Sequence, residues 1–166
     1  TWSEYLVGMV PALMPTLEEL NGRLAVMGAF RNAAPQDRLD LEDWSEEAEV
    51  PFLQSLDIGI MPLTDTPWAR GKCGYKLIQY MACDLPVIAS PVGVNAEIVE
   101  HGVNGFLAST EAEWTEALRT LLNDAALRKR MGEAGRRKVE RDYSLQVWGP
   151  RLTEMLRHIA RDSRRH

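Results

Sequence analysis

Short apolar runs alternate with helical patterns along most of the chain. The runs 23–28, 57–63 and 86–90 are nearly continuous in hydrophobic residues, which is typical of strands buried on both faces. Two further stretches, 39–44 and 106–108, are also predicted as strands. Because buried strands that alternate with helices build a parallel sheet covered on both sides, the pattern predicts a Rossmann-like, doubly wound α/β domain.

Helical periodicity is predicted between these strands and after them. Pro11 and Pro15 predict a kink or a broken start in the first helix. Ser45 has the position and the chemistry of a helix N-cap. Residues 30–36 have turn composition. Helices are expected over 3–20, 45–56, 75–83, 93–99, 111–123, 125–141 and 144–161, the last three forming a helical tail that breaks at Tyr143-Ser144.

Length and composition limit the classes of protein that the chain can represent. Its 166 residues, 45% of them hydrophobic, suit one compact domain, and no apolar run approaches the roughly 20 residues that span a bilayer. Two cysteines and three scattered histidines provide neither a disulfide framework nor metal-ligand spacing, which favours a reducing cytoplasm and no metal or other cofactor. Because the first residue is Thr1, residues 1–166 are interpreted as one domain of a longer protein.

The net charge of −5 conceals an asymmetry between the two ends of the chain. Residues 1–124 carry 7 basic and 19 acidic side chains, whereas residues 125–166 carry 12 basic and 5 acidic ones. A basic tail steers a protein toward anionic lipid or a phosphorylated substrate. The alternative is a solvated helix surface that pairs with the acidic body.

The loop over 64–74 is the first place to look for a site, because ligands of this fold class bind beyond the carboxyl ends of the strands. Its end combines two glycines, two lysines and a helix start, which together suit a diphosphate: glycine permits close backbone approach, and the amides of a first helical turn carry partial positive charge. An ordinary strand-to-helix turn with solvated lysines explains the same residues equally well. The candidate diphosphate-binding residues are Gly71, Lys72, Cys73, Gly74, Tyr75 and Lys76.

Residues 71–108 resemble the donor-binding core of the GT-B glycosyltransferases, in the large family 4 that is often called group 1. Members typically carry a glutamate, seven residues, a second glutamate and then an "AMA-G-PVVAS" stretch. The resemblance implies a C-terminal, nucleotide-sugar-binding domain of a two-domain enzyme. The matching residues here are Met81-Ala82, Leu85–Ser90, Gly93, Glu97–Val99 and Gly102–Leu107, with Asp57–Leu63 upstream and Tyr143-Ser144 downstream.

The chain departs from the family pattern at both glutamates. Gly71 stands where the first glutamate generally contacts the donor sugar, and Gln79 stands where the second contacts the ribose hydroxyls. Glutamine can still exchange hydrogen bonds with a ribose diol, whereas Gly71 has no side chain for the sugar. In a subset of the family a lysine lies three residues before the Glu or Gln, and the resemblance makes Lys76 a pyrophosphate contact. Trp44 and Ser45 lie where the family places the base, although a core position explains Trp44 equally well.

By resemblance, the whole enzyme transfers a sugar from a nucleoside diphosphate donor to an acceptor hydroxyl, with retention and without a metal. The setting would be polysaccharide biosynthesis in the cytoplasm, at the inner face of the membrane. Partners would be the nucleotide sugar, an amino-terminal acceptor domain and an anionic membrane, but no nucleic acid. No catalytic side chain is assigned, and residues 1–166 alone are expected to be inactive. The alternatives are a non-catalytic nucleotide-binding domain of receiver type, for which the strand end offers only Asp65, and a scaffold domain.

Overall fold

Five parallel strands lie at the centre of the part of the chain that the structure describes. The computed structural model describes residues 2–28 and 38–162. Strands β1 (Leu24–Met27) and β2 (Leu39–Glu42) pair with each other, and the second group has the order β3 (Gly59–Met61), β4 (Val87–Ala89) and β5 (Gly105–Leu107). All pairs are parallel, as the apolar runs predict. The expected single sheet is wrong in one respect, because no described ladder joins β1 to β3.

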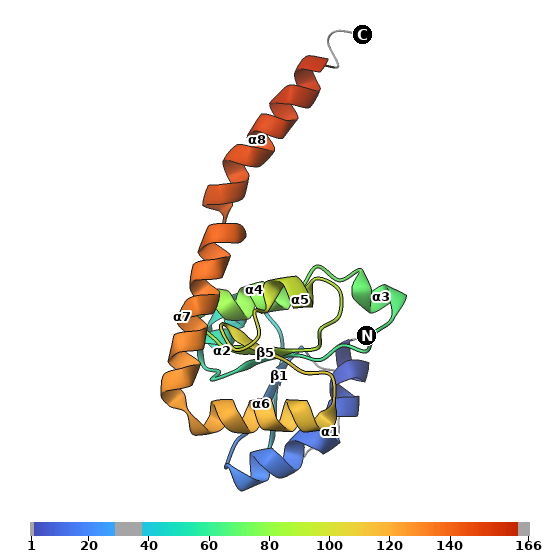
Figure 1. Cartoon of the computed structure of the whole chain (residues 1–166), viewed down its shortest axis with the longest axis vertical. Helices are drawn as coiled ribbons and strands as arrows, with labels where there is room; N and C mark the ends of the chain where they lie inside the picture. The colour runs from blue at the N-terminus through green and yellow to red at the C-terminus, as the bar shows by residue number, and fades with distance from the viewer. Residues whose placement is uncertain (1, 29–37, 163–166) are drawn as a thin grey trace.

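The described part of the chain has eight helices, and all of them except α8 lie around the body that these strands centre (Figure 1). Helices α1 and α6 supply one buried cluster, and α2, α4 and α5 supply the other. Their bounds are α1 (Trp2–Glu19), α2 (Glu46–Gln54), α3 (Pro67–Arg70), α4 (Tyr75–Ala82), α5 (Asn95–Ile98), α6 (Glu111–Asn123), α7 (Ala125–Asp142) and α8 (Leu145–Asp162).

Strand β4 shows why the fold is doubly wound. Val87, Ile88 and Ala89 are fully buried, because successive side chains of a strand point to opposite faces and both faces are covered here. Val87 and Ala89 belong to the cluster under α4 and α5, whereas Ile88 belongs to the cluster under α1 and α6. The predicted fold class is therefore confirmed.

Most predicted helix ends agree with the structure to within a few residues. Ser45 caps α2 as expected, because its Oγ accepts the amide of Ala48 at 3.1 Å. Helix α1 runs through both Pro11 and Pro15 as one assigned helix. Within the predicted loop 64–74 the structure adds α3, which Thr66 caps. The predicted turn over 30–36 lies outside the described residues.

Helices α7 and α8 form the predicted tail, which breaks at Tyr143-Ser144 as expected. Helix α7 lies against α4, and Gly132 brings it into contact with the backbone of Asp84. Helix α8 extends away from the body of the molecule (Figure 1) and leaves a row of large apolar side chains exposed to solvent. The most exposed of these are Leu145, Leu152, Met155, Leu156 and Ile159.

Candidate nucleotide-binding site

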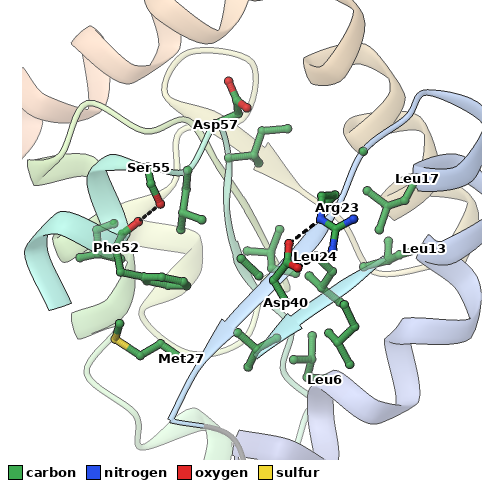
Figure 2. Close-up of a pocket in the computed structure, with 18 of the residues that line it drawn as sticks. Leu6, Leu13, Leu17, Arg23, Leu24, Met27, Asp40, Phe52, Ser55 and Asp57 are labelled. Atoms are coloured by element: carbon green, nitrogen blue, oxygen red, sulfur yellow. Dashed lines mark hydrogen bonds and ion pairs between the residues drawn. The ribbon is translucent and has the colours of Figure 1, made fainter. Parts of the chain in front are cut away.

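A cavity of about 1160 Å³ lies where the sheet is interrupted. Residues of β1, β2 and β3 line it together with α1 and α2. Figure 2 shows Phe52 of α2 on one side of the cavity and Leu6 and Leu13 of α1 on the other. Trp44, Glu49 and Lys76 also line it, and the first two come soon after the carboxyl end of β2 in the chain. The cavity therefore reaches the edge of the sheet where ligands of this fold class bind.

Glu49 of α2 joins three of the residues that the sequence singles out. The Lys76 ammonium donates to Glu49 Oε1 at 2.8 Å, across 27 residues of sequence, and the pair is partly buried. The hydrogen bond from Lys76, with smaller contributions from the side chains of Gln79 and Trp44, holds the pKa of Glu49 below its usual value against the opposing effect of burial. Lys76, the predicted phosphate contact, therefore pairs directly with this carboxylate, and the side chains of Trp44 and Gln79 lie near enough to lower its pKa slightly.

Glu49 itself was missed by the sequence analysis. It is one of three acidic residues in the first turn of α2, with Glu46 and Glu47, and acidic side chains are common there because they favour the helix N-terminus. Its position four residues after the Ser45 cap carries no motif. Only the tertiary contact with α4 distinguishes it from its two neighbours.

Trp44 lies at the surface, with 58% of its area exposed, so its alternative interpretation as a core residue is wrong. Its Cβ lies 3.3 Å from the place where a Cβ on Gly28 would stand, which brings it close to the carboxyl end of β1. An exposed indole beside a strand end offers an apolar face to a planar ring. The hydroxyl of Ser45 is used as the cap of α2 instead of pointing to a ligand.

The Gly71-Lys72 part of the loop is occupied with contacts inside the protein. The amide of Gly71 donates to the carbonyl of Trp68, and that of Lys72 to Ala69, so both complete the last turn of α3. The Lys72 ammonium lies over the ring of Tyr5, 5.4 Å from its centroid. Because these contacts occupy Gly71 and Lys72, the diphosphate-binding prediction now applies best to the residues that follow, 73–76.

Gly74 begins α4 in a conformation that requires glycine. Its φ is +66°, and a Cβ at this position would stand 2.4 Å from Cδ1 of Ile98. Its carbonyl accepts the amides of Leu77 and Ile78, whereas the amides of Tyr75 and Lys76 come first in the helix and have no acceptor within it. The start of α4 therefore offers backbone donors beside the Lys76 side chain. The neighbouring Cys73 is exposed.

Arg70 is held by an acidic neighbour in the same loop. Its guanidinium makes a bidentate ion pair with Asp65, with distances of 2.6 and 2.9 Å. The hydrogen bond from Arg70 lowers the pKa of Asp65. In this structure Arg70 is therefore held by Asp65 within the loop.

Buried polar atoms mark the remaining part of the candidate site. Gln79 Oε1 is buried and has no hydrogen-bond partner in the structure, although the Gln79 side chain contributes slightly to the lowered pKa of Glu49. A buried acceptor without a partner is costly.

Within the described residues, no three His, Cys, Asp or Glu side chains gather as metal ligands. None of the described helices combines the length and the apolar character that crossing a bilayer would need.

Comparison with known protein families shows to which family this chain is related. The family described as "Glycosyl transferases group 1" matches residues 3–124. The chain belongs to this family. Among the curated proteins, the chain is similar to the capsular polysaccharide biosynthesis glycosyltransferase CapM of Staphylococcus aureus, which is 25% identical over 150 residues that cover 86% of this chain and 40% of CapM.

Another curated relative and two solved structures are also similar to this chain. The GDP-mannose-dependent monoacylated alpha-(1-6)-phosphatidylinositol monomannoside mannosyltransferase of Corynebacterium glutamicum is 34% identical over 84 residues, which are 50% of this chain and 22% of that protein. A glycosyltransferase from Rickettsia africae has a TM-score of 0.73 at 16% identity, over 96% of this chain and 45% of the other. Anabaena Alr3699/HepE in complex with UDP-glucose has a TM-score of 0.68 at 18% identity, over 89% and 44%. The chain therefore spans less than half of each of these proteins and has the GT-B fold.

The group 1 string at Gly102–Leu107 has a structural role in this chain. Asn104 is buried, its Oδ1 accepts the amide of Glu100 at 2.9 Å, and its Nδ2 donates to the carbonyl of Ile98 at 3.2 Å. The string therefore closes the turn between α5 and β5. This part of the family string therefore stabilises the fold. The residues of the resemblance that belong to the candidate site are Trp44, Lys76 and Gln79.

Proposed function

We propose that this chain is the donor-binding half of a glycosyltransferase that takes a nucleoside diphosphate sugar. The observation that carries the proposal is the ion pair between Lys76 and Glu49, which both line the cavity together with Trp44 near the carboxyl end of β2. Two relatives support the class of donor: the Corynebacterium enzyme is GDP-mannose-dependent, and the Anabaena structure holds UDP-glucose.

Each residue has a distinct role in this proposal. The exposed face of Trp44 stacks on the base. The Glu49 carboxylate and the unpartnered Gln79 Oε1 accept hydrogen bonds from the two ribose hydroxyls, which supplies Gln79 with the partner that it lacks. Lys76 and the first amides of α4 bind the diphosphate. Lysine has three donors, so Lys76 can bind a phosphate oxygen and keep Glu49.

The proposed reaction breaks the bond between the anomeric carbon and the diphosphate and forms one to an acceptor oxygen. Negative charge grows on the leaving diphosphate, and Lys76 with the α4 amides stabilises it electrostatically, so the transfer is proposed to be metal-independent. Retention of anomeric configuration is proposed from the family resemblance. Gly71 offers no side chain to the sugar, so we propose that backbone donors or Lys72 hold it instead.

We propose two partners for the whole protein beyond the donor. An acceptor-binding domain outside residues 1–166 would complete the enzyme, because the chain spans 40% or less of its two curated relatives above. An anionic membrane is the second partner, supported by the exposed apolar side chains of α8 together with its basic residues Arg151, Arg157 and Arg161.

Calorimetric titration of residues 1–166 with UDP, GDP and ADP tests the proposal. At least one nucleotide is expected to bind. Lys76→Met is expected to weaken that binding roughly 10- to 100-fold, because hydrogen bonds to charged groups contribute about 1.5–3 kcal/mol. Lys129→Met is the matched control, since Lys129 is exposed on α7, away from the residues that line the cavity.

Two outcomes would contradict the proposal. Equal weakening by both substitutions would show that only net charge matters. A folded domain that binds none of the three nucleotides would favour the scaffold alternative, for which the absence of a side chain at Gly71 is the supporting feature.

A further inference from the structure

Four carboxylates line the cavity, and three of them have a basic partner inside the protein. These three ion pairs are Asp40–Arg23, Glu49–Lys76 and Asp57–Arg128. Figure 2 shows the first of them. The fourth carboxylate belongs to Glu42, the last residue of β2, which is exposed and makes no side-chain hydrogen bond or ion pair with any described residue. Among the described residues of the lining, Glu42 therefore supplies the carboxylate that is available to a ligand.

Glu42 lies beside the indole that the proposed function assigns to the base. The carbonyl of Glu42 accepts the amide of Gly28 at 2.9 Å, and a Cβ on Gly28 would stand 3.3 Å from the Cβ of Trp44. Trp44 in turn lies near enough to Glu49 to lower its pKa slightly, and Glu49 binds Lys76. A chain of contacts thus leads from the ammonium at the start of α4 to the end of β2.

The order of these groups matches the order of the parts of a nucleoside diphosphate. In the proposed function, on which this inference rests, Lys76 binds the diphosphate, Glu49 binds the ribose and Trp44 stacks on the base. The group that follows Trp44 in the chain of contacts is then placed for the outer edge of the base, which is the edge that forms base pairs in nucleic acids. We propose that the Glu42 carboxylate binds this edge and selects guanine, so that the donor is a guanosine diphosphate sugar.

Guanine is the base whose outer edge suits a carboxylate. An ionised carboxylate only accepts hydrogen bonds, and its two oxygens accept best from two neighbouring donors. Guanine offers such a pair in its ring N–H and its exocyclic amino group. Uracil has one ring N–H between two carbonyl oxygens, which a carboxylate repels, and the amino group of adenine lies beside a ring nitrogen that is itself an acceptor. A purine also covers more of the Trp44 face than a pyrimidine does.

Calorimetric titration of residues 1–166 with GDP, inosine diphosphate, UDP and ADP tests the proposal on the unchanged chain. Inosine diphosphate differs from GDP only in lacking the exocyclic amino group, so it removes one of the two proposed hydrogen bonds. GDP is expected to bind roughly tenfold or more tightly than each of the other three, because one hydrogen bond to a charged group is worth about that factor.

Glu42→Gln tests the same contact from the side of the protein. Glutamine keeps one acceptor but turns a donor toward the amino group of guanine, so GDP binding is expected to weaken roughly tenfold. Binding of inosine diphosphate and UDP is expected to change little, and the preference for GDP over inosine diphosphate is expected to disappear. Glu47→Gln is the matched control, because it removes the same charge from an exposed position of α2 that does not line the cavity.

Several results would overturn the inference and leave the proposed function in place. UDP or ADP could bind as tightly as GDP, or GDP and inosine diphosphate could bind equally well. Glu42→Gln could weaken all four nucleotides alike, or Glu47→Gln could have the same effect as Glu42→Gln, and either result would reduce the role of Glu42 to net charge. If the folded chain binds none of the four nucleotides, the proposed function itself is contradicted and this inference with it.

Discussion

At the residue scale, the candidate site is organised around the carboxylate of Glu49, which belongs to no sequence motif. Trp44, Lys76 and Gln79 are identified from their place relative to strands, helix starts and a family string. The structure pairs Lys76 with Glu49, and the other two side chains contribute slightly to the lowered pKa of that carboxyl. Glu49 could not be predicted because its significance depends on a contact 27 residues away in sequence. The opposite holds for the amides of Gly71 and Lys72. The sequence predicts that they are available to a ligand, but in the structure they complete the last turn of α3, a helix too short to show periodicity.

The Glu49–Lys76 pair predicts a dependence of stability on pH. Because the folded state lowers the pKa of Glu49 from 4.5, the pair stabilises the fold above the unfolded pKa, and this contribution is lost as the pH falls through the folded pKa. Glu49→Gln is therefore expected to lower the free energy of unfolding by about 1 kcal/mol or less at pH 7, with the difference shrinking as the pH falls below 4.5 and through the lowered folded pKa. Urea denaturation from pH 3 to pH 7 measures it.

A second substitution, Lys76→Met, separates this effect from a general change at α2. In a chain that already carries Lys76→Met, Glu49→Gln is expected to have a smaller effect at pH 7, because the partner that lowers the pKa is gone. An effect of the same size in both backgrounds, or one that does not change with pH, would contradict the role of the pair.

At the element scale, most helices and strands follow from periodicity and caps, and the exceptions have physical reasons. Thr110 and Glu113 form a reciprocal capping box at the start of α6, and Asp124 caps α7, so these ends are set by local chemistry that a sequence displays. The four-residue α3 and the interruption of the sheet depend on tertiary contacts, which leave no periodic pattern.

The contact of α7 with the body predicts opposite effects of one substitution at two helical glycines. A Cβ on Gly132 would stand 1.8 Å from the carbonyl oxygen of Asp84, whereas a Cβ on Gly149 in α8 would meet nothing within 4 Å. Gly132→Ala is expected to destabilise the fold by about 1–3 kcal/mol, because overpacking outweighs the gain in helix propensity. Gly149→Ala is expected to be neutral or to stabilise by up to about 1 kcal/mol.

Urea denaturation of the two variants at pH 7 measures this difference. If Gly132→Ala were as stable as Gly149→Ala, α7 would not approach the turn before β4 as closely as the structure shows.

At the scale of the whole molecule, the fold class and the family could be predicted, but the completeness of the sheet could not. Apolar runs in the sequence show that strands are buried. They do not show which strand lies beside each strand edge, because that depends on the topology of the sheet. The charge asymmetry is also resolved only by coordinates. Arg128 pairs with Asp57 of the body at 3.4 Å, whereas Arg136 and Arg141 pair with acidic residues of the tail itself.

The proposal that residues 1–166 are the donor-binding part of a longer enzyme predicts that binding and catalysis can be separated. Residues 1–166 are expected to bind a nucleotide but to transfer no sugar from UDP-glucose or GDP-mannose, because the acceptor pocket is proposed to lie outside them. A radiolabelled transfer assay with lipid and polysaccharide acceptors measures this. Turnover that Lys76→Met abolishes would show that the chain is catalytically sufficient and would contradict the prediction.

The structure of residues 1–166 bound to UDP or GDP, whichever binds more tightly in calorimetry, tests the central claim most directly. The account predicts that the base lies on Trp44, the ribose hydroxyls meet Glu49 and Gln79, and the diphosphate lies between the Lys76 ammonium and the first turn of α4. A nucleotide found elsewhere on the molecule, with the Lys76–Glu49 pair and Gln79 Oε1 left as they are here, would contradict it.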